Sequence, residues 1–392
     1  MLNQKQLDLI NATAPVVAEN AETIASTFYP LMFERYPHVR SMFNMRHQQT
    51  GEQPRALARS VVTYALNRND PEALERLMRP IVNKHVAINL QPDQYTIVAE
   101  CLMAAIGKVL GDAVTAEIFD AWSGLYWEFA ERLIDAEETT YRVLEEAPGG
   151  WRGERDFHLT DRVVESEEIV SFYFSPTDDR PIRTFQPGQY LGVALEIDGE
   201  QTLRQYSLTS RPGDDVYRIS VKREGQGRAS RYLHDHVRVG DHVRLLAPVG
   251  EMVLDARDAP VMLISAGVGQ TPMLSLMAQA LDTGRQVIYL HGARHARVHA
   301  FHESLKAMAE QYGSQLIYRY VYSDPATTDE RCHRGVINRA LLADYLPRDV
   351  TPSCYFTGPT GFMRDVDSAL AALGIDTPYR HFEYFGPSGQ LH

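Results

Sequence analysis

The chain has 392 residues and a formal net charge of −12 at pH 7, and 44% of its residues are hydrophobic. This length predicts two or three domains, since a domain usually holds about 100 to 200 residues. The composition is typical of folded globular domains, and the negative charge argues against nucleic acid as a partner. The N-terminal segment has no signal-peptide core, and no apolar run is long enough to span a membrane. We therefore expect a cytoplasmic protein without an integral membrane segment.

Three cysteines are present, Cys101, Cys332 and Cys354, and they lie far apart in the sequence without any CxxC motif. Closely spaced cysteines are typical of zinc sites, and a cysteine-ligated iron–sulfur cluster needs four thiolates. We therefore expect neither a disulfide framework nor a zinc site nor an iron–sulfur cluster.

Residues 1–147 are predicted to be all helical, because apolar residues recur every three or four positions. One such face comprises Leu74, Leu77, Met78, Ile81, Val82 and His85. Pro80 stands inside this pattern, and we expect it to open a new short helix that carries His85. A histidine on an apolar helix face is more often a core residue than a metal ligand, so the pattern alone leaves both roles open for His85.

The pattern changes at residues 148–151, Pro-Gly-Gly-Trp, where we place the first domain boundary. Residues 151–256 contain short alternating segments, such as 169–174 and 216–221, that Gly/Pro turns separate. Such segments predict an antiparallel β-barrel. Residues 258–392 then alternate strands with helices, which is typical of an α/β domain with a parallel sheet. The expected strands of this third domain are 261–265, 287–290 and 354–357.

A glycine-rich loop, Gly267 to Pro272, directly follows the first strand of the third domain and opens a helix. Backbone N–H groups at such a turn can bind a pyrophosphate, although a turn of this kind also uses glycine merely for its positive φ. The next strand ends in His291-Gly-Ala-Arg294, without the acidic residue that binds a free ribose 2′-hydroxyl. Arg294 is suited to a 2′-phosphate or to solvent, so the choice between NADH and NADPH stays open.

The middle domain contains the segments 185–190 (FQPGQY), 204–207 (RQYS) and 225–230 (GQGRAS), and FTGP follows at 356–359. An arginine can neutralise a diphosphate, a tyrosine can stack on a flavin and a hydroxyl can bind its ring, although each residue also suits an ordinary strand. In this order, ahead of and behind the glycine loop, the segments resemble the ferredoxin-NADP reductase family from Trp151 to the C-terminus.

The resemblance implies three groups of cofactor-binding residues. FAD would contact Tyr190, Arg204, Gln205, Tyr206, Ser207, Gly227 and Ser230. The nicotinamide dinucleotide would contact Gly267, Val268, Gly269, Gln270, Thr271 and Pro272. Beside the flavin would lie Glu383, Tyr384, Phe385, Gly386 and Pro387. Thr357 and Tyr384 stand where relatives often have cysteine, which would alter the rate of flavin reduction without abolishing it.

The helical region contains the segments 28–29 (FY), 41–45 (SMFNM), 51–53 (GEQ), 84–85 (KH) and 92–95 (PDQY). With these segments, residues 1–147 resemble the globin domain of bacterial flavohaemoglobins. The resemblance implies a haem b with His85 as the proximal iron ligand, Phe43 packed on the porphyrin and Lys84 among the cofactor-binding residues.

The same resemblance assigns residues to both sides of the haem. Tyr29, Gln53 and Leu57 would form the distal side, where Tyr29 faces bound oxygen. Gln53 and Leu57 are four residues apart and share a helix face if that helix begins near Gln53, which also makes Pro54 acceptable in the first turn. Tyr95 and Glu137 would hydrogen-bond around the proximal imidazole, and Glu138 is the alternative acid.

The implied activity is nitric oxide dioxygenation: electrons pass from NADH or NADPH through FAD to the haem, and the small-molecule partners are O2 and nitric oxide. We expect a monomer. Two alternatives stay open at this point. One is an oxygen-binding or sensor globin with an attached reductase, and the other is a general reductase of flavins, ferric iron or hydroperoxides.

Overall fold

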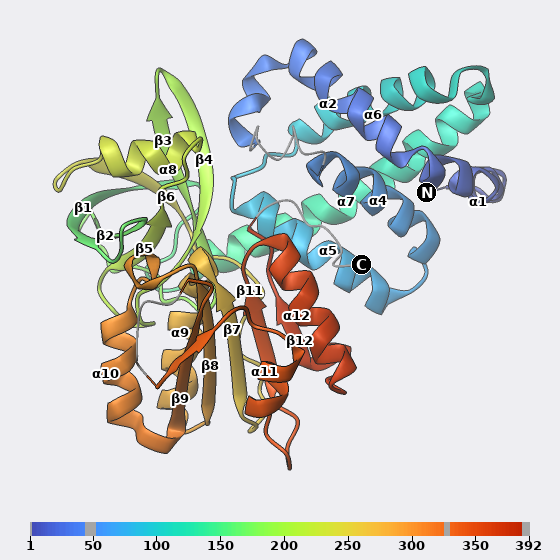
Figure 1. The fold of residues 1–392 in the computed structure, drawn as a ribbon. Helices are drawn as coiled ribbons and strands as arrows, with labels where there is room; N and C mark the ends of the chain where they lie inside the picture. The colour runs from blue at the N-terminus through green and yellow to red at the C-terminus, as the bar shows by residue number, and fades with distance from the viewer. Residues whose placement is uncertain (1, 44–51, 325–329, 386–392) are drawn as a thin grey trace.

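The computed structural model describes residues 2–43, 52–324 and 330–385, and for residues 41, 52–56 and 58 it describes the backbone only. The described N-terminal part is helical, as predicted, and lies beside two sheet-containing parts (Figure 1). Its helices are α1 (Gln4–Glu19), α2 (Ala21–Arg35), α4 (Glu52–Asn67), α5 (Pro71–Val86), α6 (Gln94–Leu110) and α7 (Ala116–Glu146). Short 3-10 segments are η1 (Pro37–Met42) and η2 (Gly111–Ala113). None of the helices described is both long enough and apolar enough to cross a membrane.

The helix that carries His85 begins after a side-chain cap and continues through its internal proline. Asp70 caps α5 by accepting a hydrogen bond from the Ala73 amide at 3.0 Å. The expectation that Pro80 opens a new helix is wrong, since α5 runs unbroken to Val86. A proline inside a helix loses one hydrogen bond, but burial of Leu74 before Pro80 and of Val82 and Val86 after it keeps the helix continuous.

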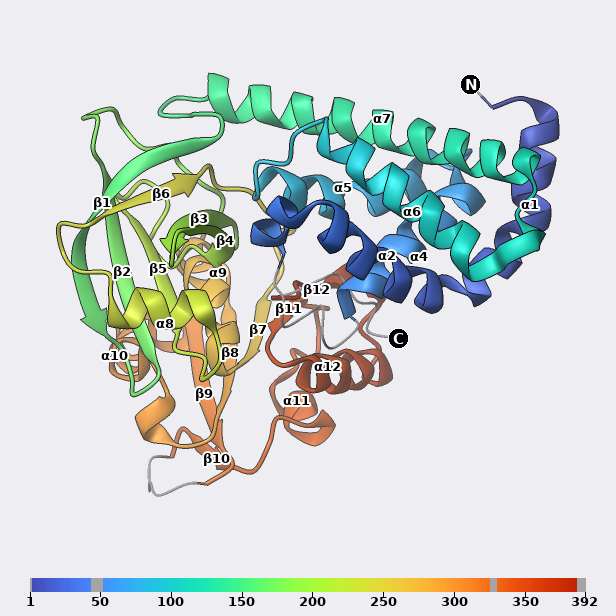
Figure 2. The ribbon, with the colours of Figure 1, turned by 90° about the horizontal axis from the view of Figure 1, so that it is seen from above.

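The middle part is an antiparallel sheet, as predicted. Its strands are β1 (Glu154–Val164), β2 (Ile169–Pro176), β3 (Tyr190–Ile197), β4 (Glu200–Ser207), β5 (Tyr217–Lys222) and β6 (His242–Leu246), with α8 (Arg228–Asp235) between β5 and β6. The strand order is β4-β3-β6-β1-β2-β5. A bridge between Leu208 and Ile219 brings the chain after β4 against β5, so the two edges of the sheet approach each other and the sheet curls. The long helix α7 reaches across to this part (Figure 2).

The last part is a parallel sheet between helices, also as predicted. Its strands are β7 (Val261–Ala266), β8 (Val287–Ala293), β9 (Leu316–Tyr322), β10 (Cys332–Arg334), β11 (Ser353–Thr357) and β12 (Arg380–Phe382), in the order β10-β9-β8-β7-β11-β12. Its helices are α9 (Thr271–Asp282), α10 (His302–Tyr312), α11 (Arg339–Tyr345) and α12 (Thr360–Ala372). Alternate residues of β7 serve opposite faces: Leu263 packs in the core that contains residues of α9 and α10, and Ile264 packs in the core that contains residues of α11 and α12.

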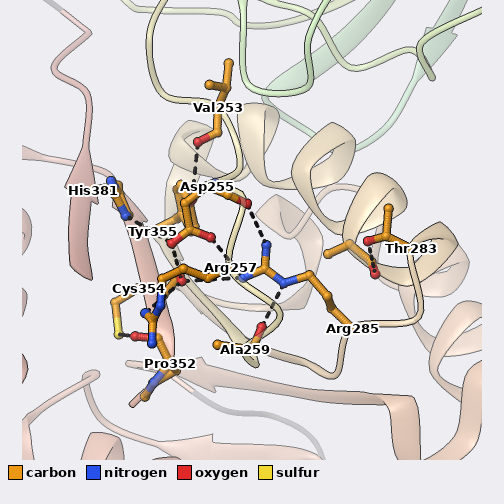
Figure 3. Close-up of polar contacts among 12 residues, drawn as sticks. Val253, Asp255, Arg257, Ala259, Thr283, Arg285, Pro352, Cys354, Tyr355 and His381 are labelled. Carbon is orange, nitrogen blue, oxygen red and sulfur yellow. Dashed lines mark hydrogen bonds and ion pairs between the residues drawn. The ribbon is translucent and has the colours of Figure 1, made fainter. Parts of the chain in front are cut away.

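The segment that joins the two sheets is fixed to the amino ends of parallel strands (Figure 3). The buried Arg285 side chain donates to the Ala259 carbonyl at 2.7 Å and forms an ion pair with Asp255 at 3.1 Å. The Ser353 hydroxyl donates to the other carboxylate oxygen of Asp255 at 2.5 Å, and the Asp255 amide donates to the Tyr355 hydroxyl. These contacts fix the connecting segment against the amino ends of the parallel strands.

Candidate functional site

The proximal residues predicted from the sequence lie together in the helical part. His85 stands in the last turn of α5, Tyr95 in the first turn of α6 and Glu137 in the second half of α7. The His85 Nδ1 atom lies 2.7 Å from Glu137 Oε1 and 3.0 Å from the Tyr95 hydroxyl, which itself donates to Glu137 Oε1 at 2.6 Å.

This network determines which nitrogen of His85 can bind a metal. A tyrosine has a single hydroxyl proton, and Tyr95 uses it toward Glu137, so the Tyr95 oxygen accepts from His85. His85 therefore presents an N–H at Nδ1, which leaves Nε2 as the nitrogen that can bind a metal. A haem iron needs one such protein ligand with its other ring nitrogen hydrogen-bonded, so the donor set fits haem.

Glu137 is a buried carboxylate, with only 4% of its surface exposed. Burial and the neighbouring Glu137 charge raise the pKa of the Tyr95 phenol, which keeps Tyr95 a hydrogen-bond donor. The Tyr126 hydroxyl donates to the Tyr95 carbonyl at 2.8 Å and so positions the start of α6. Glu138, the alternative acid, lies instead on the surface, where its carboxylate accepts two hydrogen bonds from Arg152 at 2.9 and 2.7 Å.

Of the predicted distal residues, Tyr29 belongs to an aromatic cluster and Leu57 packs against the hydrophobic core that contains this cluster. Tyr29 is buried on α2, and its ring lies 5.7 Å from that of Phe43 and 6.0 Å from that of Phe33. Leu57 of α4 is partly buried against the same core. The Gln53 backbone belongs to α4, which begins at Glu52 and has Pro54 in its first turn, but the Gln53 side chain lies outside the described residues.

Charged residues from all three parts of the chain meet next to His85. Burial lowers the pKa of Lys84, while the charges of Glu383 and Glu251 act in the opposite direction. Burial raises the pKa of the Glu383 carboxyl, which Lys84 opposes. On the neighbouring surface the Arg79 guanidinium lies 3.3 Å from Glu251, and the Asn83 side chain accepts from the Gly250 amide at 3.1 Å. The end of α5 is thus anchored to the middle part, and its Lys84 also interacts electrostatically with Glu383 of the last part.

Glu251 and Asn83 were not predicted from the sequence. Arg79 and Asn83 are four residues apart and share a face of α5. That spacing indicates a common surface, but it does not reveal the loop from another part of the chain that covers it.

The predicted flavin residues share two paired strands. Tyr190 and Ser207 are partners in the antiparallel register of β3 and β4, and Arg204 is the partner of Val193 further along. The register therefore places Tyr190 beside Ser207, and Arg204 lies three residues earlier on the same strand. Gly250, with φ of +128°, passes so close to the Tyr190 ring that a Cβ would come within 3.0 Å of it.

Arg204 carries a charge that the described protein does not neutralise. Burial lowers the pKa of Arg204, and among the described residues no carboxylate forms an ion pair with it. The nearby Arg228 forms ion pairs with Glu200 and Asp198, so these carboxylates already offset its charge. The partly buried Arg204 guanidinium donates to the Leu203 carbonyl at 2.6 Å, and its charge has no carboxylate partner among the described residues, so it fits a diphosphate ligand, as expected for the FAD site.

The remaining flavin residues flank this site. Gly227 is the N-cap of α8, and a Cβ there would lie 2.5 Å from the Ser230 hydroxyl, which accepts from the Glu224 amide. At the C-terminal end, the Glu383 carbonyl accepts from the Thr357 hydroxyl at 3.1 Å. Tyr384 is partly buried and packs on Phe382, and Phe385 is exposed. Gly386 and Pro387 lie outside the described residues.

The glycine loop follows β7 as predicted and leads through a 3-10 turn, η3 (Gly267–Gln270), into α9. Gly267 has φ of +57°, and a Cβ at Gly269 would lie 2.2 Å from the Thr357 carbonyl, so both positions require glycine. The Thr271 hydroxyl donates to the Val268 carbonyl, and Pro272 stands in the first turn of α9. Gln270 is fully buried, and within the described part of the chain neither polar atom of its side chain has a hydrogen-bond partner. A bound polar ligand fits that unpaired amide.

Family models match each of the three parts. Residues 26–133 match the globin family, residues 156–254 the oxidoreductase FAD-binding domain and residues 263–368 the oxidoreductase NAD-binding domain. The chain is 43% identical over 392 residues to the flavohemoprotein of Pseudomonas aeruginosa and 44% identical to that of Pseudomonas putida. Both alignments cover 100% of either chain.

The chain belongs to the flavohemoprotein family. The resemblance inferred from the sequence is thereby confirmed. Among solved structures, a flavohemoglobin of Malassezia yamatoensis with bound FAD and haem has a TM-score of 0.85 and 28% identity, over 98% of this chain and 100% of that one. The FAD/NAD-binding domain of a nitric oxide dioxygenase from Vibrio cholerae has a TM-score of 0.56 and 36% identity, over 60% of this chain and 100% of that one.

Proposed function

We propose that this chain oxidises nitric oxide with O2 to nitrate, with NADH or NADPH as the electron donor. The related Vibrio cholerae protein, described as a nitric oxide dioxygenase, supports the proposal. The observation that carries it is the buried network of His85, Tyr95 and Glu137. An anionic acceptor behind the ligand imidazole makes it a stronger donor to iron, which favours oxygen chemistry over oxygen storage.

We propose three domains, each of which binds one cofactor. Residues 1–147 bind haem, residues 151–256 bind FAD and residues 258–392 bind the dinucleotide. When bound, FAD converts a two-electron donor into a source of single electrons, and haem supplies an iron that accepts them and binds O2 and nitric oxide.

For the haem, the chain supplies an iron ligand, hydrogen-bond acceptors for that ligand and the residues of the distal side. His85 binds through Nε2 because Nδ1–H is held by Glu137 and Tyr95. We assign the Tyr29 hydroxyl as the distal hydrogen-bond donor, since Tyr29 is buried among the aromatic rings of Phe28 and Phe43. Leu57 adds apolar surface on the same side, and Gln53 is the second polar distal residue in this proposal.

In the FAD- and dinucleotide-binding domains, the chain neutralises the phosphate charges of the cofactors and orients them. Arg204 provides the positive charge for the diphosphate of FAD, and Tyr190 and Tyr206 provide aromatic surface for its ring. Ser207, opposite Tyr190 in the strand register, provides a hydroxyl. Residues 267–271 provide backbone N–H groups for the pyrophosphate of NADH or NADPH, and Pro272 follows in the first turn of α9.

The test is the rate of nitric oxide loss at an electrode, measured for the full-length holoprotein. We expect loss that requires both O2 and NADH or NADPH, and we expect nitric oxide to accelerate dinucleotide oxidation. His85→Ala should abolish this loss. A reductase that works equally well without His85, or dinucleotide oxidation in O2 that nitric oxide does not accelerate, would contradict the proposal and favour a general reductase or an oxygen-binding globin, respectively.

A further inference from the structure

The end of the second parallel strand lies where a dinucleotide-binding domain distinguishes its coenzymes. β8 runs parallel to β7, with Gly292 opposite Ala266, so the residues after β8 share a sheet edge with the glycine loop that begins at Gly267. An acidic residue at this place binds the 2′-hydroxyl of the adenosine ribose, whereas an arginine accommodates a 2′-phosphate. Residues 291–297 contain two arginines and no acid.

A carboxylate reaches this edge from the FAD-binding part instead. Glu168, in the turn between β1 and β2, forms an ion pair with Arg294, which follows β8 directly. The backbone fixes this approach, because the Glu167 amide donates to the Arg297 carbonyl at 3.0 Å and the Arg223 amide donates to the Glu168 carbonyl at 2.8 Å. The carboxylate that the β8 end lacks is therefore supplied across a domain boundary.

The pair is accessible to a ligand and has a second cation beside it. The Arg294 side chain is 62% exposed and that of Glu168 is 30% exposed, so a nucleotide at the surface can reach both. The Lys222 Nζ atom lies 3.9 Å from Glu168 and 3.1 Å from Glu224. Glu168 thus offsets positive charge from two sources at the place where a 2′-phosphate would bind.

We propose that Glu168 selects the coenzyme by competing with a 2′-phosphate for Arg294. A 2′-phosphate must displace the Glu168 carboxylate from the guanidinium and remain near its negative charge, whereas a free 2′-hydroxyl carries no charge to repel. The intact pair therefore favours NADH over NADPH. The inference rests on the proposed function, in which such a dinucleotide donates the electrons.

The experiment compares binding of two probes, adenosine 2′,5′-bisphosphate and 5′-AMP, to the full-length holoprotein by calorimetry. Glu168→Gln should shift the ratio of the two affinities toward the bisphosphate by about fivefold. Glu167→Gln is the matched control, because this neighbouring carboxylate lies 3.3 Å from Arg297 across the same boundary. In an Arg294→Gln background, Glu168→Gln should give a much smaller gain. The gain should also decrease at high salt.

A second readout is the rate of flavin reduction by NADPH and by NADH in anaerobic stopped flow, where the same change in ratio is expected. An unchanged ratio in Glu168→Gln would overturn the inference, and so would an equal gain in Glu167→Gln. Binding of neither probe to the unmodified protein would overturn the site itself. None of these measurements uses nitric oxide or O2, so a failure of dioxygenation would leave their result standing.

Discussion

Replacing Glu137 with glutamine removes a negative charge behind His85 and keeps the shape of the side chain. Glu137 Oε1 lies 2.7 Å from His85 Nδ1 and 2.6 Å from the Tyr95 hydroxyl, in a site where the carboxylate is almost fully buried. A ferric haem carries one more positive charge than a ferrous haem and gains more from this anion. The variant should therefore raise the haem reduction potential.

The size of the shift follows from the strength of this contact. A hydrogen bond to a charged group contributes about 1.5 to 3 kcal/mol, and about 1.4 kcal/mol corresponds to 59 mV for a one-electron couple. Glutamine still offers a neutral acceptor, so we expect the variant to lose about half of this contribution in the ferric state relative to the ferrous state. The potential should then rise by about 30 to 65 mV.

Spectroelectrochemical titration of the haem band measures this potential directly. Glu138→Gln makes the same chemical change one residue further on, where the carboxylate is paired with Arg152 at the surface, and should shift the potential by less than about 10 mV. An unmoved potential in Glu137→Gln would refute the reasoning. Equal shifts in both variants would show a general charge effect and refute it as well.

Three further predictions concern separate parts of the chain. His85→Ala should lose haem and keep flavin while Arg204→Ala does the reverse, as absorption spectra would show; loss of both cofactors from either variant would contradict separate sites. Tyr95→Phe should move the haem potential, and its combination with Glu137→Gln should differ from the sum of the single shifts, because the three side chains form one network; strict additivity would count against coupling. Burial lowers the pKa of His291 from 6.5 to about 3, so between these two pH values the unfolded chain binds a proton that the folded chain does not. As the pH decreases from 6.5, the free energy of unfolding measured in urea titrations should therefore lose about 1.4 kcal/mol per pH unit through His291. His291→Asn should reduce this slope. An unchanged slope would speak against the buried neutral histidine.

Much of the fold was predictable because each part has its own repeat. Apolar spacing of three and four residues marks the helical part, alternation marks the antiparallel sheet, and strands that alternate with helices mark the parallel sheet. Pro80 shows the limit of this reasoning. A local rule ends the helix there, but packing of the residues on either side, which the rule does not include, keeps α5 intact.

The family resemblance alone leaves the choice between Glu137 and Glu138 open, although helix periodicity contains a signal for it. Leu133 and Tyr141 stand four residues before and after Glu137, and both are buried on the same face of α7. Glu138 lies about 100° further around the helix and reaches solvent. The pairs between distant segments had no comparable signal, since Glu168 and Arg294 are 126 residues apart and come together only when two domains pack.

The nitrate yield tests the central claim most directly. One molecule of NADH supplies two electrons, and each nitric oxide that combines with O2 to form nitrate consumes one of them. With nitric oxide, O2 and limiting NADH, the full-length holoprotein should therefore form two nitrate ions for each NADH oxidised. NADH oxidation without nitrate, or nitrate formation that persists when NADH is omitted over many turnovers, would contradict the proposed dioxygenase.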